Sequence, residues 1–166
     1  MVIYHGSDVA VITPKILDSN RFLDFGKGFY TTSSHEQAVR WAQRVCDGRN
    51  SEQSIISVYN FDLEKAETDL HIIKFNEPTP EWLHFVVACR SGNEGKYRYD
   101  AAIGPVANDN VYETIRLFET GVFSEQETII RLRIIKIYNQ ILFHTEQALD
   151  YCIFTKQEII KGALNE

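Results

Sequence analysis

Three short stretches of the chain carry side chains that could hold a small molecule and act on it. "YHGS" brings together His5, Gly6 and Ser7, "GKGFYTT" sets two glycines beside aromatic rings, and "YNQILF" carries the amide of Gln140 among mostly apolar residues. Imidazole, hydroxyl and amide groups exchange hydrogen bonds, glycine lets a ligand approach the backbone, and aromatic rings stack on flat ligands. Each stretch alone is a weak signal, because a strand that ends in a turn, or a GxG without a third glycine, also explains it.

Taken together and in this order, the stretches resemble the ADP-ribosyltransferases of the diphtheria-toxin and poly-ADP-ribose-polymerase lineage. In that family a first strand carries His-Gly-Ser/Thr, a second carries Gly-Lys-Gly-aromatic-Tyr, and a late strand of the form Tyr-Asn-Glu-aromatic-Ile-Val presents a glutamate. The matching residues here are His5, Gly6 and Ser7, then Gly26, Lys27, Gly28, Phe29 and Tyr30, then Tyr138, Asn139 and Gln140.

A closer resemblance covers nearly the whole chain. The stretches "LDFGKGFYTT", "YDAAIGPVANDNVY" and "NQILFHTEQAL" resemble a bacterial branch of this clan whose genes often lie beside a small partner gene, as in toxin–antitoxin pairs. This implies a cytoplasmic bacterial mono-ADP-ribosyltransferase that uses NAD, with a small cognate antitoxin protein as a candidate partner. Arginine-directed members of the clan end the third motif in Gln/Glu-x-Glu; Leu142 stands at that last position, which disfavours arginine and leaves the ADP-ribose acceptor unknown.

The reaction implied by the resemblance is cleavage of the bond between nicotinamide and ribose in NAD, through a transition state with positive charge on the ribose ring. The Gly6 backbone would bind the nicotinamide amide, Tyr30 and Trp41 would sandwich its ring, and His5 would bind a ribose hydroxyl. No metal is implied. The resemblance makes His5, Tyr30 and Gln140 the catalytic residues, and makes His5, Gly6, Ser7, Gly28, Phe29, Tyr30 and Trp41 the NAD-binding residues.

Simpler explanations exist for several of these residues. Trp41 lies eleven positions after Tyr30. Its position in the apolar repeat of its helix is also that of a core-facing residue. His5 could be a satisfied histidine at a strand end. Lys27 and Arg21, the softer candidates for binding the pyrophosphate, read more simply as solvated surface residues.

Gln140 departs from the family, where a glutamate stabilises the cationic ring and accepts from a ribose hydroxyl. An amide oxygen still accepts a hydrogen bond, but it is uncharged and is no general base at neutral pH. Three interpretations are open: single-unit transfer to a reactive acceptor, use of a neighbouring carboxylate, or NAD binding without turnover. The candidate carboxylates are Glu125, Glu127 and Glu146, and each also suits the first turn of a helix.

Two further function classes stay open. The chain could be a catalytically silent NAD-binding or partner-binding module, or an unrelated α+β domain whose motifs agree by chance. Polymer synthesis is disfavoured, because in the polymerases the glutamate also activates the growing chain.

Strands and helices alternate irregularly, which favours an α+β fold over a doubly wound one. The resemblance implies a single domain over residues 1–166, an ADP-ribosyltransferase-like split antiparallel β core with flanking helices. The predicted strands cover residues 1–7, 29–32, 54–63, 71–75, 99–106, broken by a Gly-Pro turn, and 138–143, the last strand. The predicted helices follow Ser33 or Ser34 and stop at Gly48, run from a Thr79 cap to Gly92, and form a pair separated by Gly121 whose second member is capped by Ser124 with Glu127.

Composition sets the outer limits. The chain has 166 residues, 44% of them hydrophobic and 24% charged, as in globular proteins, and no run approaches the about eighteen apolar residues of a membrane span. Its formal charge of −6 argues against a general nucleic-acid binder. Nothing at the start indicates export, and the widely spaced Cys46, Cys89 and Cys152 are expected as reduced thiols.

Overall fold

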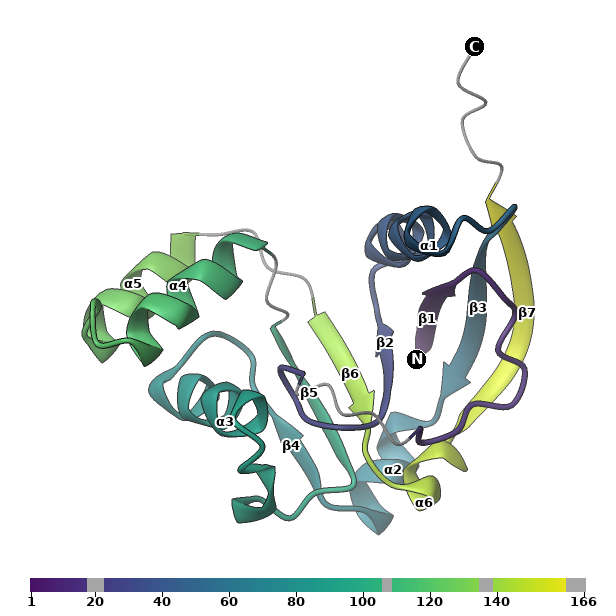
Figure 1. Ribbon diagram of the computed structural model, residues 1–166. Helices are drawn as coiled ribbons and strands as arrows, with labels where there is room; N and C mark the ends of the chain where they lie inside the picture. Colours follow the sequence, from purple (N-terminus) through teal and green to yellow (C-terminus); the bar gives the residue numbers. More distant parts are fainter. Residues whose placement is uncertain (18–22, 106–108, 135–138, 161–166) are drawn as a thin grey trace.

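The computed structural model describes residues 1–17, 23–105, 109–134 and 139–160 as an α+β fold around one seven-stranded sheet (Figure 1). The strand order is β4-β5-β6-β2-β1-β3-β7, and all neighbours are antiparallel except the parallel pair β4 and β5. The sheet is therefore mixed, whereas the sequence suggested an antiparallel core. The strands are β1 Val2–Ser7, β2 Phe29–Thr32, β3 Ser54–Phe61, β4 Ile72–Lys74, β5 Ala101–Pro105, β6 Asn139–Phe143 and β7 Cys152–Ile160.

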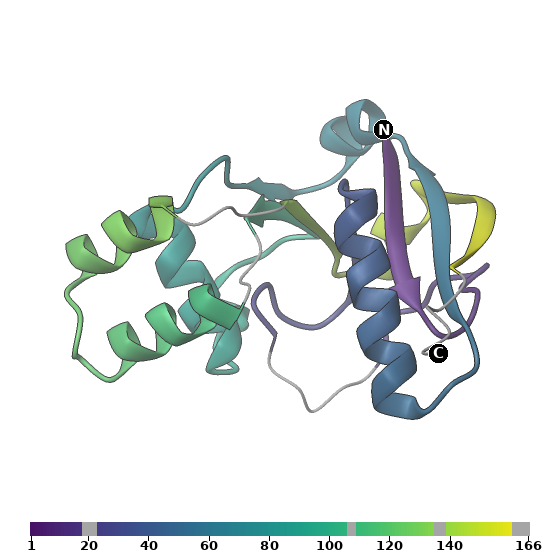
Figure 2. The same cartoon turned by 90° about the horizontal axis from the view of Figure 1, so that it is seen from above.

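Helices cover both faces of the sheet (Figures 1 and 2). On one face α1 lies over β1 and β3, while α3, α4 and α5 gather beside the β4–β5–β6 part. The short helices α2 and α6 lie on the other face. The helices are α1 His35–Arg49, α2 Leu63–Asp69, α3 Pro80–Arg90, α4 Asp109–Glu119, α5 Glu125–Ile134 and α6 Glu146–Leu149, with a 3₁₀ turn, η1, at Glu94–Lys96.

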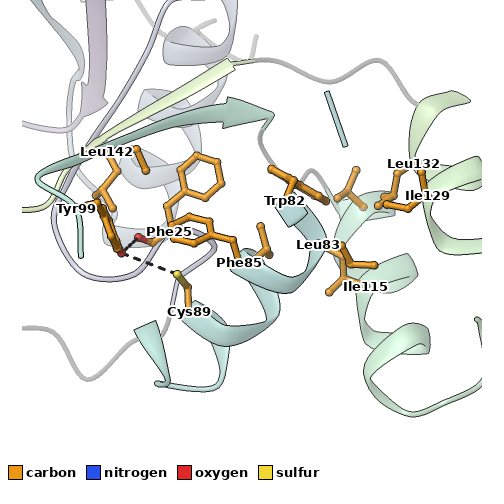
Figure 3. Close-up of a cluster of buried hydrophobic side chains, with 13 residues drawn as sticks. Phe25, Trp82, Leu83, Phe85, Cys89, Tyr99, Ile115, Ile129, Leu132 and Leu142 are labelled. Carbon is orange, nitrogen blue, oxygen red and sulfur yellow. Dashed lines mark hydrogen bonds between the residues drawn. The ribbon is translucent and has the colours of Figure 1, made fainter. Parts of the chain in front are cut away.

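Two main hydrophobic cores follow from this layering. The core on the α3 face is built around large buried rings that α3, the segment before β5 and the loop before β2 contribute (Figure 3). It contains Phe25, Trp82, Phe85, Tyr99 and Leu142. The core on the opposite face lies under α2 and α6 and contains Ile3, Phe29, Phe61, Ile141 and Phe143. Neighbouring residues of β2 and β6 therefore alternate between the two cores.

Local sequence signals account for several helix boundaries, and these predictions are confirmed. Ser34 caps α1 and accepts from the Gln37 N–H, and Thr79 caps α3 with Pro80 at its first turn. At the start of α5, Ser124 and Glu127 form the reciprocal bonds of a capping box, with Glu127 Oε2 accepting from the Ser124 N–H at 2.9 Å.

Other boundaries differ from the prediction. Helix α1 continues through Gly48 and ends at Arg49, followed by the C-cap residue Asn50 in the left-handed conformation at φ 52°. Gly104 and Pro105 lie within β5 rather than in a turn that breaks it, because both pair with β6. Helix α2 and strand β7 were not predicted from the sequence, and the last strand is β7 rather than β6. Among the described helices, none is long and apolar enough to cross a membrane.

Candidate functional site

The strand β2 is held differently by its two neighbours. All four of its residues pair with β6, from Phe29 with Phe143 to Thr32 with Gln140. Toward β1, within the described chain, only Tyr4 pairs with Thr32. We call the contact between β1 and β2 the seam; beyond Tyr4 it contains His5, Gly6 and Ser7, the first predicted motif.

The backbone of Gly6 faces this seam. Met1 and Phe61 exchange both backbone hydrogen bonds, at 2.6 and 2.8 Å, so they form a hydrogen-bonded pair of the β1–β3 ladder. In an antiparallel ladder such pairs recur at every second residue. The backbone N–H and C=O groups of Ile3, His5 and Ser7 therefore point toward β3. The N–H and C=O of Gly6 therefore point away from β3, toward the part of the seam where pairing with β2 has stopped.

His5 occupies the place that a regular ladder would give to Gly6. A continued β1–β2 ladder would pair Gly6 with Tyr30, but the Tyr30 carbonyl instead accepts from Nδ1 of His5 at 2.7 Å. Because a carbonyl only accepts, Nδ1 carries the proton and the neutral ring leaves Nε2 as an acceptor. Burial lowers the pKa of His5, opposed by this hydrogen bond, so the neutral ring is favoured.

Gly6 also determines how closely α1 approaches β1. A Cβ at position 6 would lie 2.3 Å from the Ala38 carbonyl oxygen and 2.7 Å from the Ala42 nitrogen, too close for any side chain. Ala38 and Ala42 form the buried face of α1, whereas Trp41 is 52% exposed. Trp41 is thus not a core-facing residue; its ring is exposed on the flank of α1, with Cζ of Arg44 5.8 Å from the ring centre.

Tyr30 is anchored to its own loop. Its hydroxyl donates to the Gly26 carbonyl at 2.5 Å and accepts from the Phe25 N–H at 3.2 Å, while its ring packs against the α3-side core. Burial raises the pKa of Tyr30 well above its usual value, with the charge of Asp24 acting in the same direction. The phenol therefore stays neutral and can position a ligand, but it does not exchange protons at neutral pH.

Gln140 is a buried amide with an unused donor. The residue is 9% exposed, and its Nε2 has no hydrogen-bond partner among the described residues. Its cross-strand neighbours are Thr32 on β2 and Gly104 on β5, and Gly104 has no side chain to meet it. A buried unpaired amide costs about 1–3 kcal/mol. A ligand oxygen beside β6 would remove that cost.

The three predicted catalytic residues lie on three adjacent strands, but their side chains do not share one face. Tyr4 pairs with Thr32, and Thr32 with Gln140, so even-numbered residues of these strands point to the α1 and α3 side. His5 points to the other side, where its ring lies 4.6 Å from that of Phe29. The seam is where the two sets meet, because the His5 ring reaches the Tyr30 backbone there.

Other predicted NAD-binding residues have structural roles. Ser7 donates to Asp8 at 3.2 Å. Phe29 is a buried core residue behind His5. A Cβ on Gly28, where φ is +151°, would lie 2.2 Å from the Phe143 carbonyl oxygen, so this glycine permits close contact between the loop and β6. Arg21 and Tyr138 lie outside the described residues.

The acids considered as substitutes for a glutamate are engaged elsewhere. Glu125 contacts His84 Nε2 at 2.5 Å, Glu127 caps α5, and Glu146 accepts from the Ile16 N–H at 3.3 Å. Use of one of these carboxylates in place of Gln140 is therefore disfavoured. Within the described part of the chain, no three His, Cys, Asp or Glu side chains gather as metal ligands would.

Two shallow hollows lie near the β4–β5–β6 part of the sheet, away from the seam. One, of about 320 Å³, is lined by Asn76, Glu77, Pro78, Pro105, Leu132, Arg133 and Asn139. The other, of about 390 Å³, is lined by residues 74–77, Thr79 and Glu81. Neither is lined by His5, Gly6 or Tyr30. The first lies beside the strand end that carries Gln140, since Asn139 is in its wall.

Thr32, a polar residue between the motifs, was not predicted from the sequence as part of the site. The hydroxyl of Thr32 lies 2.7 Å from both the Asn139 carbonyl oxygen and Oε1 of Gln37, and it accepts from the Ser34 N–H at 3.0 Å. Thr32 thus joins β2, β6 and the start of α1 beside Gln140. Its place at the end of the "GKGFYTT" stretch was the available signal.

The architecture defines the molecule as an α+β domain with an open strand seam. Its sequence places it in a family: a model described as "Protein of unknown function (DUF3990)" matches residues 1–154, and the chain belongs to that family. Comparison with curated proteins and with solved structures found no match.

Proposed function

We propose that the protein is a mono-ADP-ribosyltransferase that cleaves NAD at the seam between β1 and β2. The single observation that supports this most is that β1–β2 pairing stops at Tyr4 and Thr32, so the backbone of Gly6 faces the seam. An N–H and a C=O on one glycine match the carbonyl and amino groups of a primary amide such as nicotinamide. The first two motifs border this edge, and the third lies on β6, the next strand beyond β2.

The residues fit NAD from both sides of the seam. On one side, Nε2 of the neutral His5 accepts from a ribose hydroxyl, and the bond to Tyr30 holds its ring in place. On the other, Tyr30 and the exposed Trp41 offer aromatic surfaces, each worth about 0.5–1.5 kcal/mol in an offset stack. His5 and Tyr30 are positioning groups, because neither pKa shift favours proton transfer by them at neutral pH.

Gln140 limits the reaction. Its amide binds a ribose oxygen and so orients the sugar, but it does not neutralise the positive charge of the transition state. A charge pair at 4 Å is worth about 4 kcal/mol at an effective dielectric constant of about 20, or about a thousandfold in rate. We therefore expect slow NAD hydrolysis and transfer of a single unit to an acceptor that is itself a good nucleophile.

The test compares the natural chain with His5→Ala and Gln140→Glu. It measures NAD consumption and, by mass spectrometry of a lysate incubated with NAD, the ADP-ribosylated products. His71→Ala and Gln157→Glu are matched controls, since both residues are exposed and distant in the strand order from β2. We expect His5→Ala to lower NAD cleavage at least tenfold, and Gln140→Glu to preserve or raise it. If the natural chain neither consumes NAD nor forms an ADP-ribosylated product, the proposal is wrong.

A second candidate is a catalytically silent module that binds NAD or a partner. It is favoured by one observation, the neutral Gln140 with the candidate acids engaged elsewhere. Calorimetry with NAD beside a turnover assay separates the two. Binding without product supports the silent module, and a product peak removes it.

A toxin role in the bacterial cytoplasm, with a small antitoxin as partner, rests on the sequence resemblance alone. Its test is growth during induced expression, with His5→Ala as the inactive control. A growth defect that His5→Ala abolishes, and that co-expression of a neighbouring small gene relieves, is the expected result. Equal growth of cells with the natural chain and the variant would contradict it.

A further inference from the structure

Arg90, in the last turn of α3, is a buried cation that the described structure compensates incompletely. Its side chain is 9% exposed, and its Nε lies 4.0 Å from Oδ1 of Asp24, beyond hydrogen-bond distance. Its Nη1 is buried and has no hydrogen-bond partner among the described residues. Removing a guanidinium from water without pairing its N–H groups is costly, so this arrangement favours an additional anion.

An aromatic ring holds the guanidinium in a fixed plane. Cζ of Arg90 lies 4.1 Å from the centre of the Tyr112 ring on α4, and Tyr112 is 53% exposed. A stacked guanidinium keeps the N–H groups along its edge available, and that planar fork fits two oxygens of a phosphate. An exposed ring beside it adds a surface for a flat group.

A short path of contacts connects this place to Tyr30. Cys89, next to Arg90, lies 3.9 Å from the Tyr99 hydroxyl, and that hydroxyl donates to the Phe25 carbonyl at 2.7 Å (Figure 3). The Phe25 N–H in turn donates to the Tyr30 hydroxyl. Asp24, beside Arg90, is also close enough to act on the pKa of Tyr30. Arg90 and Tyr30 thus both lie beside the loop that contains Asp24 and Phe25, on the α3 side of the sheet.

We propose that Arg90, held by Tyr112, binds the pyrophosphate of NAD while the nicotinamide end lies at Gly6. This rests on the proposed function, and it names the group that holds the charged half of the substrate. Arg90 takes the role for which Lys27 and Arg21 were the sequence candidates. In the transfer reaction Arg90 forms no covalent bond; it binds substrate and holds the ribose at the seam.

The experiment measures binding by calorimetry with four probes: NAD, inorganic pyrophosphate, orthophosphate and nicotinamide. The variants are Arg90→Gln, Arg90→Lys and Tyr112→Ala. The control is Arg116→Gln, which lies on α4 but is exposed and bonded to Glu113. Circular dichroism melting checks that each variant folds, and the melting temperature of the natural chain with pyrophosphate gives a readout that needs no variant.

We expect Arg90→Gln to weaken the binding of both NAD and pyrophosphate about 10- to 100-fold, the range for one lost charge-assisted contact. Nicotinamide should bind as before, and Arg116→Gln should have no effect. Arg90→Lys keeps the charge but not the fork, and should fall between. Tyr112→Ala should weaken pyrophosphate about two- to fivefold.

The outcomes separate the two proposals. If Arg90→Gln turns over NAD and binds it with the affinity of the natural chain, the role of Arg90 alone is overturned. Pyrophosphate binding that depends on Arg90, without any binding of NAD, would overturn NAD as the ligand and with it the proposed function. Orthophosphate bound as tightly as pyrophosphate would show a free-phosphate site instead. Equal loss of nicotinamide binding in Arg90→Gln would show a general structural defect.

Discussion

The two edges of β2 are built in opposite ways. Toward β6 every residue of β2 is paired, and Gly28 lets the backbones touch where the strand begins. Toward β1 the pairing stops at Tyr4 and Thr32, and the His5 ring takes the next carbonyl. The first edge uses its backbone groups for stability, and the second leaves those of Gly6 facing the seam.

The difference shows how one strand serves both structure and binding. A closed ladder satisfies its own hydrogen-bonding groups and has none left for a ligand. At the seam, a side chain satisfies Tyr30 and holds the two strands together, and the N–H and C=O of the buried Gly6 face the place where the described β1–β2 pairing has stopped. Nδ1 of His5 has a hydrogen-bond partner, whereas Nε2 of Gln140 has none among the described residues. We therefore assign His5 to positioning and expect Gln140 to gain a partner when a ligand binds.

The largest effect is expected at the closed edge. Gly28→Ala would place a Cβ 2.2 Å from the Phe143 carbonyl oxygen at a positive φ. Backbone strain and overpacking together should lower the free energy of unfolding by about 4 kcal/mol. Urea denaturation measures it. Gly48→Ala, where nothing lies within 4 Å, is the control and should raise stability by about 0.5–1 kcal/mol. A Gly28→Ala protein as stable as the natural chain would contradict the closed-edge description.

Gly6→Ala probes the open edge. Its Cβ would meet the backbone of α1 at Ala38 and Ala42. We expect a loss of about 2–3 kcal/mol in unfolding free energy, less than at Gly28, because a helix can shift away from a strand more easily than paired strands can separate. The comparison is sharpened by nicotinamide binding, which Gly6→Ala should abolish even at temperatures where the variant is folded. Retained nicotinamide binding would argue against Gly6 as its contact.

Thr31→Val tests a side-chain bond inside the closed edge. The buried Thr31 hydroxyl donates to the Ile141 carbonyl at 3.1 Å. Replacing it with an isosteric methyl should cost about 1 kcal/mol in unfolding free energy and leave NAD binding unchanged. Equilibrium denaturation and calorimetry measure the two quantities. A change in NAD affinity would show that the two edges are coupled.

The smallest effect is the pH dependence contributed by His5. Its folded pKa is below the ordinary value of 6.5, so the unfolded chain binds the proton more readily between the two values. The free energy of unfolding is therefore not lowered by His5 above the ordinary pKa, and it falls as the pH decreases through that window. His5→Gln, which still donates to Tyr30, should flatten the slope between pH 7 and 5. Equal slopes for the two proteins would argue against a buried neutral His5.

Much of the local structure could be predicted because its causes lie within a few residues. Ser34, Thr79 and Ser124 cap the helices to which they were assigned, and residues 29–32 form the strand that was expected. The strand β7 was missed because it is an edge strand with a mostly exposed, polar middle, so its alternation of apolar residues is weak. Gly104 and Pro105 were taken as a turn because their fit in β5 depends on pairing with β6, which is distant in sequence.

The sequence by itself determined the order of the three motifs, the glycines that permit close contacts, and most helix caps, because these depend on residue type and short spacing. Only the tertiary structure decided that Trp41 is exposed, that the Tyr30 carbonyl belongs to His5, and that Gln140 and Arg90 are buried with unused donors. The physical reason is that hydrogen-bond satisfaction is a property of neighbours in space. The groups that surround Gln140 and Arg90 come from strands, loops and helices far apart in the chain, and no local pattern shows which donors they leave unpaired.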